Sequence, residues 1–321
     1  MSRFTWHGGG LEAAKARYGG EDWLDLSTGI NPVPWPGVEA VAIDWWRLPD
    51  ESALAALESA AAGHFGVDPA HVLALPGTEV GLRLAGLLLP GPGRHVVPSY
   101  RTHGEMIRDS RALSREELPA AGSGTLVLAN PNNPDGHVFS REAMRAIACG
   151  EGWLVVDEAF ADSDPSISMA GDVAEDRRLL VFRSFGKFFG LAGVRLGFVI
   201  GPSAMLARMR AALGAWPVSA GAIAIGTAAY RDRAWIEETR DAIDRHAIAL
   251  DGVLRAAGLT PAGRCPLFRL VEVADAHALF ERLAARAILT RPFADNPRWL
   301  RIGLPGDGEG LARLRRALAD G

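Results

Sequence analysis

Cysteines and long apolar runs are scarce in this 321-residue sequence, and their scarcity argues against several classes of protein. Cys149 and Cys265 are the two cysteines and lack metal-ligand spacing, so we expect free thiols and no metal site. The N-terminus has no apolar core of the kind found in signal peptides, and no uninterrupted apolar run is long enough to span a bilayer. We therefore expect a soluble, cytoplasmic protein without a membrane partner.

An excess of charge of either sign is also missing. The formal net charge is −4 at pH 7, and the sequence pI is about 6.1. This balance gives no reason to expect nucleic acid as a partner, and no basic patch or helix-turn-helix extension suggests a DNA-binding regulator. Apolar residues make up 48% of the chain, which at this length suits two subdomains with sizeable cores.

Lysine is rare, since two lysines stand against 32 arginines. One of them, Lys187, lies in a glycine-rich stretch from Ser184 to Gly197 between two apolar runs that predict buried strands. An amine can form an imine and can lose its proton when desolvated, whereas a guanidinium can do neither. Ser184 and Arg195 could converge on one anion beside this lysine. On this segment alone, a surface lysine in a packed loop is an equally good interpretation.

The Ser-x-x-Lys pattern also begins the active sites of β-lactamases and penicillin-binding proteins, but those need a later Lys-Thr-Gly, and no lysine follows Lys187. The segment instead resembles the cofactor-lysine segment of the fold-type I pyridoxal phosphate enzymes, the class I/II aminotransferase superfamily. This resemblance implies that Lys187 binds the cofactor aldehyde covalently and that Ser184 and Arg195 bind its phosphate. It further implies an α/β fold with a large domain around a mostly parallel central sheet, a small α+β domain and a homodimer.

Other segments carry the same resemblance. Gly77-Thr78-Glu79 opens a predicted helix, where free N–H groups bind phosphate. The stretch 130–136 resembles the family loop Asn-Pro-x-Asn-Pro-(Thr/Ser)-Gly, in which Asn133 would donate to the cofactor phenolate. Tyr100 would stack on the pyridine ring, and Asp157, which ends an apolar strand, would hold the protonated ring nitrogen. The expected cofactor-binding residues are Gly77, Thr78, Glu79, Tyr100, Asn133, Asp157, Ser184, Lys187 and Arg195, with Lys187 and Asp157 as the catalytic residues.

Three positions depart from the family pattern. Phe160 stands where many relatives have a tyrosine that donates to the cofactor phenolate, so that hydrogen bond must be missing or supplied elsewhere. Leu48 stands where a tyrosine commonly reaches the cofactor phosphate of the neighbouring subunit, which weakens one contact expected between subunits. Asp135 replaces the usual threonine or serine of the asparagine-rich loop.

The C-terminal third contains two arginines that suit an anionic substrate. Arg301 lies in an otherwise apolar stretch, where a guanidinium needs an anion, and the resemblance implies the substrate α-carboxylate or else a structural pair with a core acid. Arg291 could reach a second anion, although a structural role is as good an interpretation. The expected substrate-binding residues are His7, Gly8, Gly9, Asn31, Arg291 and Arg301.

Within the superfamily, the His7-Gly-Gly segment, the stretch from Ser27 to Asn31 and the second arginine look like the threonine-phosphate decarboxylases of cobalamin biosynthesis. Gly10 departs from that pattern, because these relatives usually have Asn there. The resemblance implies decarboxylation of L-threonine O-3-phosphate to (R)-1-aminopropan-2-yl phosphate. Histidinol-phosphate aminotransferases share almost every other feature and remain the alternative. For the domain organisation, we expect an N-terminal arm over residues 1–38, a large cofactor-binding domain over 39–216 and a small domain over 217–321.

Overall fold

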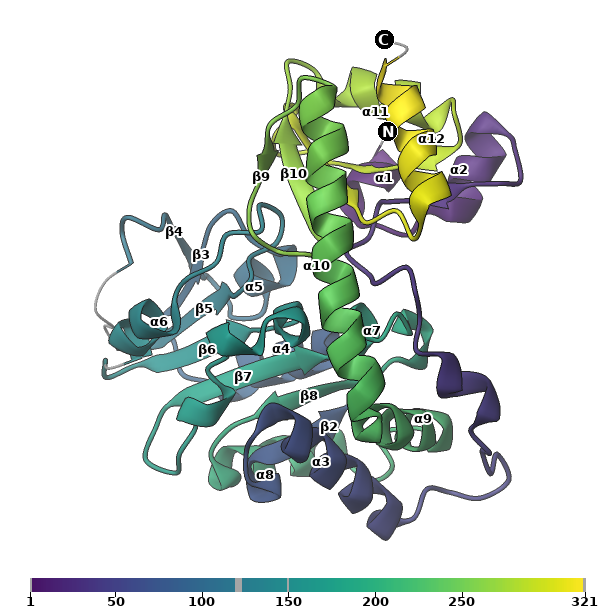
Figure 1. Cartoon of the computed structure of the whole chain (residues 1–321). Helices are drawn as coiled ribbons and strands as arrows, with labels where there is room; N and C mark the ends of the chain where they lie inside the picture. Colours follow the sequence, from purple (N-terminus) through teal and green to yellow (C-terminus); the bar gives the residue numbers. More distant parts are fainter. Residues whose placement is uncertain (1, 119–122, 149, 320–321) are drawn as a thin grey trace. The chain divides into compact units, whose positions relative to one another are not determined.

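The computed structural model describes residues 2–118, 123–148 and 150–319 (Figure 1). Contacts divide the chain into two compact units. The small unit consists of Met1–Val33, Pro134–His137 and Glu238–Gly321, and the large unit of Pro34–Asn133 and Val138–Glu237. The domain boundaries expected from the sequence stay a prediction. Cys149 lies outside the described residues, whereas Cys265 is a buried thiol whose pKa burial raises to about 12.

The large unit is built on a seven-stranded sheet with the strand order β2-β8-β7-β6-β5-β3-β4. All neighbours pair in parallel except β8, which is antiparallel to both β2 and β7. The predicted α/β fold with a mostly parallel sheet is therefore confirmed. The strands are β2 (Val72–Leu75), β3 (Gly93–Val96), β4 (Arg111–Leu113), β5 (Thr125–Ala129), β6 (Trp153–Asp157), β7 (Leu179–Ser184) and β8 (Gly197–Ile200).

The central strands are buried along their length because helices supply apolar faces to the sheet. Every residue of β5 and β8 is buried, as expected for a mostly parallel sheet covered by helices. The core beside α4 and α8 includes Leu75, Leu82, Phe182 and Met209, none more than 1% exposed. The helices of the large unit are α3 (Glu51–Phe65), α4 (Thr78–Leu88), α5 (Arg101–Glu105), α6 (Arg141–Ala148), α7 (Phe185–Phe188), α8 (Ser203–Leu213) and α9 (Ala220–Arg231).

The sequence pattern favours one long helix over residues 219–257, but the chain does not form it. The chain forms α9, breaks at Asp232 and continues as α10 (Arg233–Ala256). Asp232 has non-helical angles, φ −82° and ψ 72°. Its Oδ1 accepts a hydrogen bond from the Trp235 N–H at 3.2 Å, as a capping carboxylate does, and its Oδ2 accepts one from Trp35 Nε1 at 3.0 Å. The break is thus stabilised by a tertiary contact with a distant part of the chain.

The small unit contains a second, antiparallel sheet with the order β12-β13-β10-β9. A parallel pair, β1 with β11, joins the N-terminal segment to the C-terminal part of the chain within this unit. Every helix in the described ranges is too short or too polar to cross a membrane. The elements of the unit are α1 (Ser2–Trp6), α2 (Leu11–Tyr18), β1 (Leu24–Asp25), β9 (Pro261–Ala262), β10 (Phe268–Glu272), α11 (Ala276–Ala284), β11 (Ile288–Leu289), β12 (Arg291–Pro292), β13 (Trp299–Gly303) and α12 (Gly308–Ala319).

Candidate active site

The carboxyl ends of three adjacent strands bring together much of the predicted chemistry. Ala129 at the end of β5 is the register partner of Asp157 at the end of β6, and Asp157 is the partner of Phe182 in β7. Ser184 ends β7 two residues later, and the Asn130–Asn133 segment follows β5. In parallel α/β sheets this edge carries the ligand site, because loops from several strands open there together.

An anion cradle forms beside this edge from segments far apart in the sequence. Gly77 has φ +90°, and a Cβ atom on it would lie 2.6 Å from Arg195 Nη2, so the guanidinium packs directly against the turn. A Cβ atom on Gly197 would lie 2.7 Å from the Thr78 nitrogen, and Gly197 is the register partner of Ser184. The Arg195 guanidinium and the first turn of α4 therefore lie close together, next to the strand end that carries Ser184. A permanent cation and helix N-terminal N–H groups are what a phosphate group requires.

Lys187 lies on α7, the four-residue helix that directly follows β7. Its Nζ is 5.6 Å from the ring centroid of Phe160. The flanking Phe185 and Phe188 are almost completely buried. A Cβ atom on Gly186 would lie 2.7 Å from the Ala192 Cα atom, so the glycine lets the two backbones meet. These contacts fix the helix while the lysine side chain itself stays partly accessible.

The Asp157 carboxylate has a buried histidine as its partner, which the sequence did not reveal. Asp157 is 7% exposed and His103 is fully buried, and His103 Nε2 lies 3.0 Å from Asp157 Oδ2. The other carboxylate oxygen accepts from the Ala159 N–H at 3.1 Å. The two side chains are 54 positions apart, and the one available signal was that His103 lies three residues after Tyr100, about one helical turn away.

Tyr100 stands at the start of α5 and is held by its hydroxyl. Tyr100 Oη donates to Glu79 Oε2 at 3.1 Å. Burial, aided by the Glu79 carboxylate, raises the pKa of the Tyr100 phenol, so it remains neutral at physiological pH. Asn133 closes the loop after β5, and its neighbour Asn132 donates from Nδ2 to the Pro98 carbonyl at 2.9 Å, which anchors that loop.

In the small unit, the two predicted arginines lie side by side. Arg291 in β12 is the direct register partner of Arg301 in β13. Arg301 is 4% exposed and donates from Nη2 to the Ser27 carbonyl at 2.9 Å. Burial, together with the neighbouring Arg291, lowers the pKa of Arg301 to about 9. An anion bound between the two guanidinium groups would relieve their mutual repulsion.

The N-terminal predicted residues contact the same region of the small unit. The Gly9 N–H donates to Ser27 Oγ at 2.8 Å, and a Cβ atom on Gly8 would lie 2.4 Å from the Ser27 carbonyl oxygen. Asn31 is 4% exposed and accepts from the Val33 N–H at 3.1 Å. His7 is exposed, and its Nδ1 lies 2.8 Å from the Gly8 carbonyl.

The predicted cofactor-binding residues all belong to the large unit, and the predicted substrate-binding residues all belong to the small unit.

The residues present fit pyridoxal 5'-phosphate. The cradle at Gly77 and Arg195 suits its phosphate, the Tyr100 ring suits its flat heterocycle, Asp157 suits a protonated ring nitrogen and Lys187 suits the aldehyde. The described residues hold no cluster of three or more His, Cys, Asp or Glu side chains placed to bind a metal ion.

Comparison with known proteins decides the family. The sequence profile described as "Aminotransferase class I and II" matches residues 111–318. The chain belongs to this family. Its members are pyridoxal phosphate enzymes, and pyridoxal 5'-phosphate is the cofactor of this chain.

Among curated proteins, two threonine-phosphate decarboxylases match over nearly the full length of this aminotransferase-family chain. The one from Sinorhizobium sp is 43% identical, covering 99% of both chains, and the one from Pseudomonas aeruginosa is 38% identical, covering 97% of this chain and 96% of the other. A histidinol-phosphate aminotransferase from Rhodospirillum centenum is 30% identical over 88% of this chain and 87% of its own length. The solved histidinol-phosphate aminotransferase from Sinorhizobium meliloti in complex with pyridoxal-5'-phosphate superposes with a TM-score of 0.84 at 22% identity, covering 97% of this chain and 94% of the other, and supports the fold.

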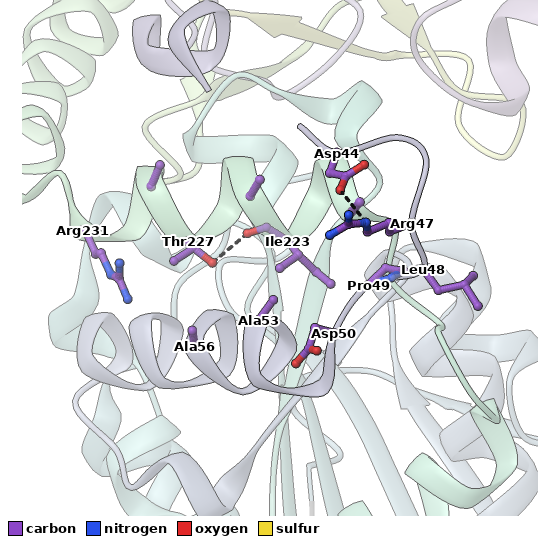
Figure 2. A pocket seen from close by; sticks show the side chains of 13 residues that line it. Asp44, Arg47, Leu48, Pro49, Asp50, Ala53, Ala56, Ile223, Thr227 and Arg231 are labelled. Carbon is purple, nitrogen blue, oxygen red and sulfur yellow. Dashed lines mark hydrogen bonds and ion pairs between the residues drawn. The ribbon is translucent and has the colours of Figure 1, made fainter. Parts of the chain in front are cut away.

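A separate pocket of about 630 Å³ lies on the large unit (Figure 2). It is enclosed by the segment that carries Leu48, by α3 and by α9, and contains none of the predicted site residues. Asp44 and Arg47 face each other beside it, with Oδ2 and Nε 3.7 Å apart. Small side chains form much of its wall, namely Ala53, Ala56, Ala220, Ala224 and Ala228.

Proposed function

We propose that this chain decarboxylates L-threonine O-3-phosphate to (R)-1-aminopropan-2-yl phosphate, a step of cobalamin biosynthesis. The observation that carries the proposal is the similarity to two threonine-phosphate decarboxylases, at 43% and 38% identity over nearly the full length. The similarity to the histidinol-phosphate aminotransferase is weaker, 30% over 88% of the chain. The paired arginines of the small unit support a substrate that carries two anionic groups.

The large unit would hold the cofactor through residues at the sheet edge. Arg195, Ser184 and the N–H groups of the Gly77–Glu79 turn would bind the phosphate, and the ring of Tyr100 would stack on the pyridine. Asn133 would donate to the phenolate oxygen. Asp157 would accept a hydrogen bond from the protonated ring nitrogen, and His103, 3.0 Å away, would keep the carboxylate oriented.

The small unit would bind the two anionic ends of the substrate. Arg301 would hold the α-carboxylate and Arg291 the phosphate, with the His7–Gly9 segment beside them. When bound, the cofactor supplies an electron sink that takes the electron pair of the breaking bond. Carbon dioxide would leave from Cα, and the Lys187 ammonium group would deliver one proton to Cα in its place. Its Phe160 neighbour, 5.6 Å away, offers an aromatic face that stabilises the cationic form of the amine.

Transamination of histidinol phosphate is the alternative function. It is favoured by the 30% identity to a histidinol-phosphate aminotransferase. In that reaction Lys187 would move the Cα proton to a cofactor carbon instead. Arg301 would then take the substrate phosphate, or the carboxylate of the co-substrate in the second half-reaction.

Product analysis with both substrates separates the two proposals. The purified holoenzyme is incubated with threonine phosphate and, in parallel, with histidinol phosphate plus 2-oxoglutarate. We expect aminopropanol phosphate from the first incubation and little glutamate from the second. Glutamate formation with histidinol phosphate, without aminopropanol phosphate in the first incubation, would favour the aminotransferase.

We also propose that the protein forms a homodimer through the surface around Trp45–Leu48. Trp46 is 96% exposed, Trp45 is 68% exposed and Leu48 is 65% exposed, beside the alanine-lined pocket of Figure 2. Contiguous exposed apolar side chains mark association surfaces, and tryptophan is enriched there. Trp46→Lys should shift the protein to a monomer in sedimentation velocity, whereas Ile248→Lys on α10 should leave the dimer intact. A monomeric parent protein would contradict the proposal.

The cytoplasmic location remains a prediction. A cytoplasmic enzyme would use cofactor and phosphorylated substrate from the same compartment. Cell fractionation with an antibody to the chain tests it. Recovery in the membrane or extracellular fraction would contradict it.

A further inference from the structure

The Glu79 carboxylate accepts hydrogen bonds from side chains of α4 and of the start of α5. Tyr100 Oη donates to Oε2 at 3.1 Å, and Thr102 Oγ1 lies 2.8 Å from Oε2 and 3.0 Å from Oε1. Arg83 Nε, one turn along α4, donates to Oε1 at 2.7 Å. Both carboxylate oxygens are therefore engaged by side chains, and two of the three donors lie at the start of α5.

The phosphate contact expected of this turn comes from backbone N–H groups, so the Glu79 carboxylate needs a separate explanation. A carboxylate repels a phosphate dianion, and its oxygens can only accept hydrogen bonds. The anion cradle is formed instead by its neighbours on the same turn, Gly77 and Thr78, together with Arg195. Glu79 directs its charge toward the tyrosine and threonine donors.

The helix α5 also carries the partner of Asp157, the carboxylate proposed to hold the pyridine nitrogen. α5 begins after Tyr100, and its third residue is His103, whose Nε2 lies 3.0 Å from Asp157 Oδ2. A second link between α4 and α5 runs from Arg83 Nη2 to Glu105 Oε2 at 3.0 Å. The five-residue helix α5 thus connects the Tyr100 ring with the Asp157 carboxylate at the end of β6. Glu79 holds the first turn of α5 against the Gly77–Glu79 turn.

We infer that Glu79 is a positioning residue that fixes the Tyr100 ring and the first turn of α5 relative to the cofactor phosphate site. Its carboxylate acts through the Tyr100 hydroxyl and does not itself contact the cofactor phosphate, which its backbone N–H can still approach. The inference rests on the proposed cofactor site in the large unit, and it is independent of which substrate the enzyme uses. It predicts that loss of the Glu79 carboxylate weakens cofactor binding, because the Tyr100 ring is no longer held in one position.

A double-mutant cycle on cofactor binding tests the inference. Pyridoxal phosphate is titrated into the apo form of the parent, Glu79→Ala, Tyr100→Phe and the double variant, by absorbance and by visible circular dichroism per bound cofactor. We expect Glu79→Ala to raise Kd about tenfold and to reduce the dichroism, because a charge-assisted hydrogen bond is lost. Tyr100→Phe keeps the ring and should reproduce most of the loss, and the double variant should be within about twofold of Glu79→Ala.

Two further variants keep the test decisive. Glu79→Gln preserves the side-chain shape and one hydrogen-bond acceptor, so it should weaken cofactor binding only about threefold. If Glu79→Ala does not fold, Glu79→Gln takes its place in the cycle. Glu105→Gln removes a carboxylate from the same network without touching Tyr100 and should keep Kd within about twofold of the parent. Additive losses in the cycle, or an equal loss in Glu105→Gln, would overturn the inference. Because the titration needs no substrate, neither result bears on the decarboxylase proposal, whereas a parent protein that binds no cofactor would contradict the proposed cofactor site itself.

Discussion

At the scale of single residues, Lys187 combines an accessible amine with a rigid setting. Its Nζ lies 5.6 Å from the centroid of the Phe160 ring, and α7 is held by buried phenylalanines on either side of the lysine. Arginine, which fills nearly every other basic position of the chain, could not form a covalent bond to an aldehyde. The proposed covalent bond to the cofactor therefore requires an amine at this position.

The first prediction is that Lys187 carries the cofactor covalently. Borohydride reduction of the holoenzyme, followed by peptide mass mapping, should place the pyridoxyl group on Lys187. Lys15 is the internal control, because it is the second lysine of the chain and forms surface ion pairs with Glu12 and Glu21. A label on Lys15, or none on cofactor-loaded protein, would contradict the assignment.

The second prediction concerns Asp157. Asp157→Asn should retain cofactor but lose activity by roughly 10²-fold or more, because the ring nitrogen is no longer held protonated by a preorganised carboxylate. Turnover and cofactor content are measured on the same preparation. Asp176→Asn, an exposed carboxylate of the same unit, is the matched control and should keep parent activity. Near-parent turnover of Asp157→Asn would show that another carboxylate performs this role.

The third prediction is that Arg195→Ala weakens cofactor retention more than it slows the chemistry. One charge-assisted contact to phosphate contributes roughly 1.5–3 kcal/mol, so Kd for pyridoxal phosphate should rise about 10-fold to 150-fold. Activity at saturating cofactor should fall much less. Unchanged cofactor affinity would place the phosphate elsewhere.

Sequence reasoning reached the residues with distinctive local patterns but missed their partners in space. Lys187, Ser184 and Arg195 could be identified from one segment and a family resemblance. His103 could not, because its pairing with Asp157 depends on where α5 meets the end of β6. Glu79 was predicted as a phosphate contact because it belongs to a helix-opening turn. The roles of the predicted site residues stay proposals until the variants are measured.

At the scale of elements, a buried charge network anchors the strands that carry the site. Arg183 of β7 is 2% exposed and pairs with both Glu158 and Asp162, while His64 Nε2 of α3 lies 3.0 Å from Asp162 Oδ1. The Arg183 and His64 side chains hold the pKa of Asp162 below its usual range, although burial opposes this. Glu158 and Arg183 directly adjoin Asp157 and Ser184, so the network fixes the two strand ends that carry the site.

The fourth prediction is that Asp162→Asn destabilises the fold strongly. Removing one partner leaves the Arg183 cation poorly compensated in the interior, which typically costs about 3–5 kcal/mol in free energy of unfolding. Urea denaturation followed by tryptophan fluorescence measures the loss, with Asp176→Asn as the exposed control. In the parent protein, the depressed pKa of Asp162 means that its contribution is present above the unfolded-state value near 3.9 and is lost as the pH falls below it. Parent-like stability of Asp162→Asn would contradict this role.

Elements with strong local signals follow directly from the sequence. The alanine-rich segment predicts a helix from about Glu51 to Phe65, and α3 spans these residues, with the Asp50 carboxylate accepting from the Ser52 N–H at 2.8 Å. The α9–α10 break was missed because Trp35, nearly 200 residues earlier, binds Asp232. The apolar pattern favours a strand over residues 95–99, but β3 lies at Gly93–Val96, since Pro98 has no N–H to give to a sheet ladder. A tertiary contact thus decided the helix break, and a local proline ended the strand.

At the scale of the whole molecule, the residues proposed for cofactor chemistry and those proposed for substrate binding belong to separate units of the chain. The strand edge of the large unit carries the amine, the carboxylate and the phosphate cradle, whereas the paired arginines belong to the small unit. A member of this family can therefore change substrate through the small unit while it keeps its cofactor residues. This division explains why the family was evident from the cofactor segments, while the substrate rests on a few residues and on overall similarity.

Turnover with threonine phosphate in the absence of any oxo acid tests the central claim most directly. The holoenzyme is given excess substrate while released carbon dioxide and the absorbance of the bound cofactor are followed together. The fifth prediction is that carbon dioxide is released over many turnovers and that the cofactor is recovered as pyridoxal phosphate. A reaction that stops after one turnover with the cofactor as pyridoxamine phosphate, and restarts when 2-oxoglutarate is added, would contradict the decarboxylase function.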